Sequence, residues 1–300
     1  MTSDFKTELA VWTERAEAAV KKWLPADNDY PGVMPSAMRY SVLAGGKRLR
    51  PLMLLYICEA AGGDLSDAEP FAAAMEFIHT SSLVHDDLPA IDNDELRRGK
   101  PTTHAAFGES AAILAGDALL NYAYEVIIKG IAMAGCKEGA VKAADVIARR
   151  SGVYGMLGGQ GLDVESDKGT FFKDGINKLD YTYERKTAAL IEASLMAGAY
   201  LAGAEEETVS ALERIGHDIG MAFQIQDDIL DVTSDSATLG KPVFSDQKNN
   251  KNTYVTLLST EGAREKAEEY AMSALNEAAS LPFDSTFLKG IINYLNSRKF

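Results

Sequence analysis

Residues 83–102 read LVHDDLPAIDNDELRRGKPT, with five acids in the ten positions that begin at Asp86. The apolar run FIHTSSLV leads directly into these acids, and its periodic apolar residues predict a helix. Pro89 has no N–H to donate and disrupts a helix around the residues before it. Asp86 and Asp87 are therefore predicted to end a straight helix, and Asp92 to fold back toward them from a distorted turn.

A second acidic segment, FQIQDDILDV at 223–232, has the spacing of a regular helix. At roughly 100° per residue, Asp227 and Asp231 lie about 40° apart, and Gln224 and Asp228 fall within the same stripe. Like charges this close raise each other's pKa, and the residues around these acids are apolar. Such a face requires a positive partner, and oxygen ligands favour a hard divalent cation, chiefly Mg²⁺.

Two such segments in one chain predict a site for several magnesium ions. A single short acidic motif is more often a solvated helix end, but these two each lie in apolar surroundings beside basic residues. Magnesium is usually held by a few carboxylates together with substrate phosphates, which predicts a phosphorylated ligand, a diphosphate. The acids assigned to the metal are Asp86, Asp87, Asp92, Asp227, Asp228 and Asp231.

Basic residues accompany both acidic segments and predict two anion sites, one on metal and one on side chains. The segment AGGKRLRP at 44–51 supplies Lys47 and Arg50 after two glycines. Further cations are Arg97, Arg98, Lys186 and Lys241. Arg48, taken alone, is interpreted as an ordinary surface charge. The net charge of −14 argues against nucleic acid as a partner, because that surface is polyanionic.

Five segments, in this order, resemble the trans-isoprenyl diphosphate synthases: GGKRLRP, HDDLPAIDNDELRRGKPT, GGQGLD, ERKTAALI and FQIQDDILD. They run from about residue 40 to about residue 255 and are most similar to the bacterial farnesyl and geranylgeranyl diphosphate synthases. The resemblance implies an all-α fold, a single domain over 1–300 in which antiparallel helices surround a deep cavity, and usually a homodimer. The residues themselves indicate the same class, because apolar residues recur at spacings of three and four and no convincing run of alternating β-branched residues is present. Helix-length base rates indicate about ten helices.

The resemblance also implies a reaction, the head-to-tail condensation of an allylic diphosphate (dimethylallyl, geranyl or farnesyl) with isopentenyl diphosphate. The product would be farnesyl diphosphate, geranylgeranyl diphosphate or both, by ionisation, condensation and proton elimination. About three Mg²⁺ ions would neutralise the leaving diphosphate. The released diphosphate is the expected base, because no side-chain base is evident.

Residue roles follow from the same resemblance, motif by motif. The isopentenyl diphosphate site would comprise Lys47, Arg50, His79 and Arg98. The allylic diphosphate site would comprise Arg97, Lys186, Thr187, Gln224 and Lys241. Lys186, Thr187 and Gln224 are also the expected catalytic residues, with side-chain oxygens turned toward the allylic cation. Gln160 and Asp163 match a cavity-wall motif and are interpreted as packing residues.

Product length stays open between C15 and C20. In relatives, a bulky residue five positions before the first aspartate often forms the cavity floor, and here that position is Ser81. Small side chains at Ser81 and Ser82 favour a deeper pocket and C20, whereas the general likeness to farnesyl diphosphate synthases favours C15. Ideal helix geometry places Ser82 and Ile78 closer than Ser81 to the Asp86 face.

Two other functions are alternatives, a class I terpene cyclase and a subunit of a heteromeric prenyl synthase. A cyclase would carry an Asn/Ser/Glu-type second motif, and here the second motif is a full DDILD. A non-catalytic subunit would be expected to lose one aspartate motif, and both are intact. Both alternatives are therefore less favoured than the synthase.

Breaker residues predict connections between helices at 25–32, 61–70, 98–102, 166–175 and 234–252. Within 61–70, SDAE is expected to begin a helix with Ser66 as its cap. The last connection is long and polar, as functional lids often are. It carries Phe244 where many relatives have glycine.

The N-terminal sequence does not predict a signal peptide, and no apolar run reaches the roughly 20 residues of a membrane span. The expectation is a cytoplasmic protein without stable membrane insertion. Cys58 and Cys136 both lie in apolar context and are predicted to be buried, reduced thiols.

Overall fold

The computed structural model describes residues 3–27, 30–166, 175–233 and 252–297. These residues are almost entirely helical, so the predicted all-α class is confirmed. The helices are α1 (Ser3–Trp23), α2 (Met34–Val42), α3 (Leu49–Ala60), α4 (Leu65–Asp86), α5 (Thr103–Phe107), α6 (Glu109–Met133), α7 (Lys137–Ser151), α8 (Met156–Ser166), α9 (Gly175–Tyr183), η1 (Glu184–Ala188), α10 (Ala189–Leu201), α11 (Glu206–Thr233), α14 (Tyr254–Ala278) and α15 (Thr286–Asn296). Two short strands, β1 (Leu96–Arg97) and β2 (Lys100–Pro101), form an antiparallel hairpin.

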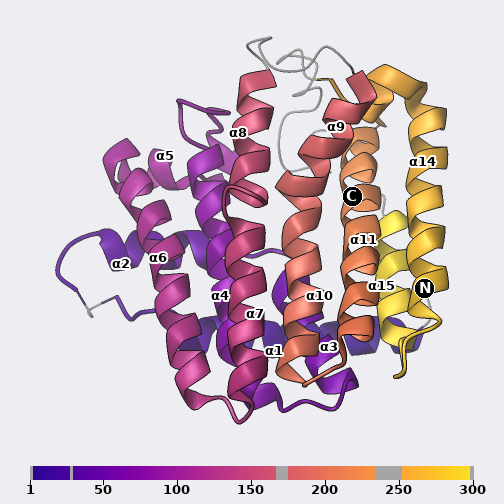
Figure 1. Ribbon diagram of the computed structural model, residues 1–300. Coiled ribbons are helices and arrows are strands. Elements are labelled where there is room, and N and C mark those ends of the chain that lie inside the picture. Colours follow the sequence, from indigo (N-terminus) through magenta and orange to yellow (C-terminus); the bar gives the residue numbers. More distant parts are fainter. Residues whose placement is uncertain (1–2, 28–29, 167–174, 234–251, 298–300) are drawn as a thin grey trace.

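The longer helices stand side by side. Figure 1 shows α6, α7, α10, α11 and α14 in that order across one face of the bundle, with consecutive members running in opposite directions. Helix α4 packs against α6 and also contacts α3 and α10. Helices α8 and α9 lie at the end of the bundle that the C-terminal end of α11 reaches (Figure 1). The candidate site is at this end.

The core is a large apolar cluster drawn from most helices of the bundle. Helices α3 and α10 are buried over nearly their whole length, which fits their almost uniformly apolar sequences. Glycines set how closely neighbouring helices approach. A Cβ on Gly198 would lie 2.5 Å from the Leu54 carbonyl oxygen, and one on Gly220 would lie 2.3 Å from Ala188 Cα. The second contact places α11 directly against η1.

One helix begins earlier than its sequence predicts. Helix α4 starts at Leu65, and its cap is Asp64, whose side chain accepts a hydrogen bond from the Ser66 N–H at 2.8 Å. The prediction of a cap at Ser66 was therefore wrong. Both residue types are good caps, and the aspartate comes first along the chain.

The predicted connection at 98–102 belongs to the β hairpin rather than to an irregular loop. Arg98 and Gly99 have φ angles of 54° and 73°. These left-handed values at two successive positions are those that a two-residue type I′ hairpin turn requires. The predicted connections at 166–175 and 234–252 lie largely outside the described residues.

The two cysteines have different environments. Cys58 is buried, as predicted, and burial raises its pKa to about 12. Cys136 is exposed, so its predicted burial was wrong. It lies in the turn between α6 and α7 and caps α7, where its Sγ accepts a hydrogen bond from the Gly139 N–H at 3.4 Å. Its apolar neighbours in sequence therefore do not surround it in space.

Among the described helices, α6 is long and apolar enough to cross a membrane by length and composition. In the structure, 39% of its most apolar stretch is buried. The sequence-based expectation excluded this stretch because Asp117, Glu125 and Lys129 interrupt it. Core helices of bundles meet the same criteria, and α6 packs against α4, α2, α5 and α7. Length and composition alone therefore do not make α6 a span.

Candidate active site

The first acidic segment has the geometry that Pro89 predicts. Helix α4 ends at Asp86, and the Asp92 N–H donates a hydrogen bond to the Asp86 carbonyl oxygen at 3.0 Å. Between them, the Ile91 N–H donates to the Leu88 carbonyl oxygen at 2.9 Å. Asp92 is thus returned to the end of α4, which confirms the predicted turn.

Asp87 is fixed by an arginine. Its buried carboxylate accepts hydrogen bonds from Arg97 Nε at 2.7 and 2.9 Å and from Arg97 Nη2 at 2.5 Å. Because Arg97 lies on β1, the hairpin is tied to the end of α4. Burial raises the pKa of Asp87, and the pairing with Arg97 acts in the opposite direction. The two residues were assigned separately to metal and to allylic diphosphate, yet here they form one ion pair.

Helix α8 connects the first acidic segment to η1. Gln160 donates from Nε2 to Asp86 Oδ1, and Lys186 donates from Nζ to Asp163 Oδ2 at 2.6 Å. A Cβ on Gly159 would lie 2.3 Å from the Lys186 backbone nitrogen, so α8 and η1 are in close contact. From the sequence, Gln160 and Asp163 were interpreted as packing residues, whereas in the structure each has a polar partner among the site residues.

The second acidic segment is connected to η1 by a further hydrogen bond. Thr187 Oγ1 donates to Gln224 Oε1 at 2.7 Å, which joins η1 to α11. The element η1 is a single π-helical turn, and such turns are frequent at functional sites. Lys186 and Thr187, adjacent in this turn, contact α8 and α11 respectively. The turn therefore links the two acidic segments.

Asp228, like Asp87, is anchored by residues distant in sequence. Its buried carboxylate accepts hydrogen bonds from the Tyr183 hydroxyl at 2.9 and 2.8 Å and from the Tyr254 N–H at 3.0 Å. Tyr183 ends α9 and Tyr254 begins α14. Neither tyrosine was predicted from the sequence. Tyr183 directly precedes the ERKT motif, which is the only sequence signal that either one carries.

Charged side chains from three other elements lie within electrostatic range of Arg50, at the start of α3. Burial lowers the pKa of Arg50 to about 10, an effect that Glu76 and Asp227 oppose and Arg98 reinforces. Charges influence one another this way only at short range. Arg50 of α3, Glu76 of α4, Arg98 of the hairpin turn and Asp227 of α11 therefore share one region. The second acidic segment and the predicted isopentenyl diphosphate site adjoin each other.

His79 lies on α4 beside these arginines. Burial lowers its pKa well below the ordinary value, and Arg50 and Arg98 lower it further, so the ring is neutral at pH 7. The Arg98 guanidinium donates a hydrogen bond to the Gly45 carbonyl oxygen. A Cβ on Gly46 would lie 2.7 Å from Arg98 Cζ. The two glycines before Lys47 therefore make room for a cation from the hairpin.

Arg48 was predicted to be a surface charge, but in the structure it is buried. Its side chain is 1% exposed and forms ion pairs with Glu17 of α1 and Glu76 of α4. The prediction was wrong because Glu17 is 31 residues away along the chain, and nothing local indicates the contact.

The assignment of acids to a metal stays a prediction. In the described part of the chain, no three His, Cys, Asp or Glu side chains come together closely enough to hold an ion. Both acidic segments supply carboxylate oxygens, the ligand type that Mg²⁺ prefers, and this ion commonly completes its shell with water and substrate phosphates. The donors therefore fit magnesium that binds together with a diphosphate. Lys241 and Phe244 lie outside the described residues.

The three residues assigned to the cavity floor lie in α4. Ile78 and Ser81 are buried, and Ser81 Oγ donates a hydrogen bond to the Ile78 carbonyl oxygen at 2.8 Å. Ser82 is partly buried, and its Oγ donates to the His79 carbonyl oxygen at 2.8 Å. Both hydroxyls are thus satisfied by their own helix. Their role in setting product length stays a prediction.

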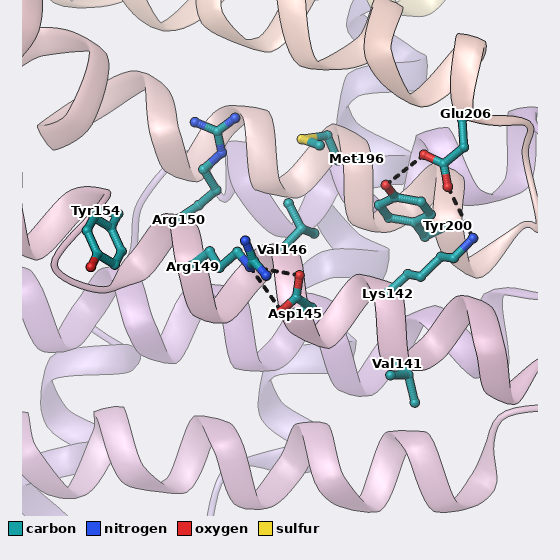
Figure 2. A pocket seen from close by; sticks show the side chains of 10 residues that line it. All are labelled: Val141, Lys142, Asp145, Val146, Arg149, Arg150, Tyr154, Met196, Tyr200 and Glu206. Carbon is teal, nitrogen blue, oxygen red and sulfur yellow. Dashed lines mark hydrogen bonds and ion pairs between the residues drawn. The ribbon is translucent and has the colours of Figure 1, made fainter.

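A groove of about 730 Å³ lies on the outer surface between α7 and α10, apart from these residues (Figure 2). Its cations are already paired with acids. Lys142 contacts Glu206 at 3.1 Å, and Arg149 contacts Asp145 at 3.0 Å. The groove therefore does not resemble an anion site.

Comparison with known proteins places the chain in a class. It belongs to the polyprenyl synthetase family, whose model matches residues 32–282. It is accordingly a prenyl-transferring enzyme, of the kind that makes short-chain prenyl diphosphates, and neither alternative function is favoured.

Named relatives cover most of the chain. A farnesyl diphosphate synthase of Geobacillus stearothermophilus is 41% identical over 268 residues, 89% of each chain. A chloroplastic geranylgeranyl pyrophosphate synthase of Catharanthus roseus is 44% identical over 266 residues, 87% of this chain and 73% of the relative. The crystal structure of a geranyltransferase from Helicobacter pylori, complexed with magnesium and isoprenyl diphosphate, superposes with a TM-score of 0.81. It is 31% identical and covers 98% of this chain and 97% of its own.

Proposed function

We propose that this enzyme condenses an allylic diphosphate with isopentenyl diphosphate and releases farnesyl diphosphate, geranylgeranyl diphosphate or both. One observation carries the proposal. A series of hydrogen bonds runs from α4 through α8 and η1 to α11, and it brings both acidic segments and Lys186 to one end of the bundle. Arg97 is paired with Asp87 at the same end of α4. Two diphosphates need two anion sites near metal ligands, and this arrangement supplies the side chains for both.

The basic residues would divide between the two substrates. Isopentenyl diphosphate would be held by Lys47, Arg50 and Arg98, with the neutral ring of His79 as a hydrogen-bonding partner. The allylic diphosphate would be held by Arg97, Lys186 and Lys241 together with ions bound by the acids. Magnesium in that position would offset the negative charge of the departing diphosphate. The number of ions, predicted as about three, is part of the proposal.

In the reaction, the allylic C–O bond to diphosphate breaks. A C–C bond then forms between allylic C1 and the terminal carbon of isopentenyl diphosphate. The oxygens of Thr187 and Gln224, already hydrogen-bonded to each other, would turn the negative ends of their dipoles toward the allylic cation. The proton lost from the condensed product passes to the released diphosphate. His79 is a poor base for this step, because burial and neighbouring arginines lower its pKa.

The product would contain 15 or 20 carbons, and the two similar relatives named above make one product each by name. Small residues at Ser81 and Ser82 support the longer product, because they leave room beneath the acidic segment. Phe77 and Tyr122 support the shorter one. Their rings lie 5.9 Å apart, centroid to centroid, one turn below these serines.

We also propose that the enzyme works as a homodimer. Exposed apolar side chains on α6 support this, because a stripe about 100° wide contains Ile113, Leu114 and Ile128. Ile128 is 66% exposed, and Tyr154, which follows α7, is 82% exposed. A second copy would cover this surface. Size-exclusion chromatography with light scattering should give twice the mass of one chain, and Ile128→Asp should shift it toward the monomer.

The decisive experiment is an incubation with Mg²⁺, labelled isopentenyl diphosphate and each of the C5, C10 and C15 allylic diphosphates, with products identified by chain length. A dominant C20 product, with the C15 primer accepted, would support the deeper pocket. A product that stops at C15 would support the same enzyme with a floor above Ser81. The absence of elongation with every primer would contradict the proposal and favour a cyclase or a partner subunit.

Two further points stay predictions from the sequence. One is that residues 1–300 form a single domain, and the other is that the enzyme resides in the cytoplasm. Limited proteolysis tests the first, because a single domain should yield no stable fragment shorter than the family match at 32–282.

A further inference from the structure

The guanidinium of Arg48 is the centre of a buried polar cluster. Its Nε donates to Glu17 Oε1 at 2.6 Å, one Nη to Glu76 Oε1 at 2.5 Å, and the other Nη to the Val42 carbonyl oxygen at 2.6 Å. The side chains of Arg48 and Glu76 are 1% and 2% exposed. The charges of Arg48 and Glu76 would each be costly to bury alone, and their pairing offsets that cost.

The three partners of Arg48 belong to three different helices. Glu17 is on α1, Val42 ends α2, and Glu76 is on α4. Arg48 itself is the residue before α3, with φ and ψ of 50° and 33°. A non-glycine residue in this left-handed conformation is uncommon and requires support from its surroundings. The contacts of the side chain therefore hold the strained turn that presents Lys47 and Arg50.

Glu76 also acts electrostatically on two arginines of the predicted isopentenyl diphosphate site. Its carboxylate attracts Arg50, and Arg98 also lies within its field. Arg50 Nε is buried and has no hydrogen-bond partner within the described residues. Glu76 nevertheless pairs with Arg48 rather than with Arg50. Without Arg48, a buried carboxylate would remain beside two arginines that are needed for substrate.

We propose that Arg48 is a positioning residue for the isopentenyl diphosphate site. It holds the turn before α3 and neutralises Glu76, which leaves the guanidinium groups of Arg50 and Arg98 directed to the diphosphate instead of to Glu76. This inference rests on the proposed function, because it assigns that diphosphate to Arg50 and Arg98. It gives Glu76 and Glu17 a role in substrate binding through Arg48.

The test is a comparison of steady-state constants for Arg48→Met, Arg48→Lys and Glu17→Gln. In Arg48→Met the KM for isopentenyl diphosphate should rise about tenfold or more, by the scale of losing one charge-assisted contact. The KM for the allylic diphosphate and the kcat should stay within about twofold. Arg48→Lys keeps the charge but cannot reach three acceptors, so it should show a smaller rise. Glu17→Gln keeps the Arg48–Glu76 ion pair intact, so it should show the smallest rise in the KM for isopentenyl diphosphate.

A second pair of changes separates positioning from general destabilisation. In the double variant Arg48→Met with Glu76→Gln, no carboxylate remains to draw Arg50 away, so much of the affinity for isopentenyl diphosphate should return. Arg150→Met is the matched control, because Arg150 also joins two acids, Glu192 at 2.7 Å and Glu213, and none of the three has an assigned role in substrate binding. It should lower the melting temperature without changing either KM.

Binding of inorganic diphosphate, measured by calorimetry, gives a readout that does not depend on turnover. The wild type should bind it more tightly than Arg48→Met. A folded Arg48→Met enzyme with an unchanged KM for isopentenyl diphosphate, or with both KM values raised equally, would overturn the inference while the proposed function stands. If the wild type does not elongate any primer, the proposed function fails. If Arg48→Met does not fold, the Arg48→Lys and Glu17→Gln variants decide the question by the same ratio of KM values.

Discussion

The acidic segments of α4 and α11 hold adjacent aspartates in different ways. At α4 the helix stops, and a turn returns Asp92 to Asp86. In α11 the helix continues through its acids to Thr233. Asp87 is anchored by a charged arginine from a hairpin, whereas Asp228 is anchored by a tyrosine hydroxyl and a backbone N–H.

The two segments nevertheless share one feature, which is that their two adjacent aspartates have different environments. Adjacent residues on a helix point about 100° apart, so that one of two neighbouring acids faces the protein when the other faces the site. In each segment the second aspartate is the buried and anchored one. The first aspartate of each pair, Asp86 or Asp227, is partly exposed. Asp86 accepts a hydrogen bond from Gln160, and Asp227 lies within the electrostatic field of Arg50. This difference predicts that the two aspartates of each pair have separate roles.

The largest effect is expected from the first aspartates. Asp86→Ala or Asp227→Ala should lower turnover by roughly a thousandfold or more, because each removes a preorganised charge at the departing diphosphate. The fold should remain, as circular dichroism and the melting temperature would show. A variant with a near-normal rate would contradict the metal assignment of that acid.

A smaller effect on turnover is expected from the anchored aspartates. Asp87→Asn and Asp228→Asn should each lower turnover by about tenfold, on the scale of residues that orient metal ligands without binding the metal. Urea titration would compare the free energies of unfolding. Asp87→Asn should cost about 1–2 kcal/mol, because Arg97, which is 29% exposed, loses its closest acid and retains the longer contact with Asp94 at 3.9 Å. Asp228→Asn should cost less than about 1 kcal/mol. Equal losses of turnover in all four single variants would contradict the distinction between the first and the anchored aspartates.

Substitutions in the part of α4 just before Asp86 are expected to change the product without a large loss of rate. Ser81→Tyr should shorten the product, because the ring would occupy the path of the growing chain. Ser82→Tyr is the matched comparison, since helix geometry places it closer to the Asp86 face. Product lengths from the incubation with allylic primers would show which serine lies under the chain. An unchanged distribution in both variants would place the floor on another helix.

The smallest effect on turnover is expected at Glu192, which has no assigned role in the reaction. Burial raises the pKa of Glu192 on α10 to about 7, with Arg150 opposing. A carboxyl with a raised pKa in the folded state contributes stability that is present below its ordinary pKa and is lost as the pH rises to about 7. Between about pH 4.5 and pH 7, the free energy of unfolding of Glu192→Gln should therefore fall less than that of the wild type, by on the order of 2 kcal/mol. Denaturant titrations at several pH values would measure it, and an unchanged slope would contradict the raised pKa.

Local chemistry made part of the structure predictable from sequence. Pro89 predicted both the end of α4 and the return of Asp92, and the apolar periodicity predicted the helical class. What escaped prediction depends on residues distant in sequence. The burial of Arg48 requires Glu17, and the anchoring of Asp228 requires Tyr254. Short sequence motifs identify which residues carry charge, but packing decides which of them face the substrate.

The division between the two aspartates of each pair is the central claim, and metal-dependent binding tests it most directly. We would measure, by calorimetry, the affinity for inorganic diphosphate at saturating Mg²⁺ for the wild type and for Asp86→Asn, Asp87→Asn, Asp227→Asn and Asp228→Asn. Variants of the first aspartates should lose more than about a hundredfold in affinity, and variants of the anchored aspartates about tenfold. Loss of equal size at Asp86 and Asp87, or undiminished binding in Asp86→Asn, would contradict the claim.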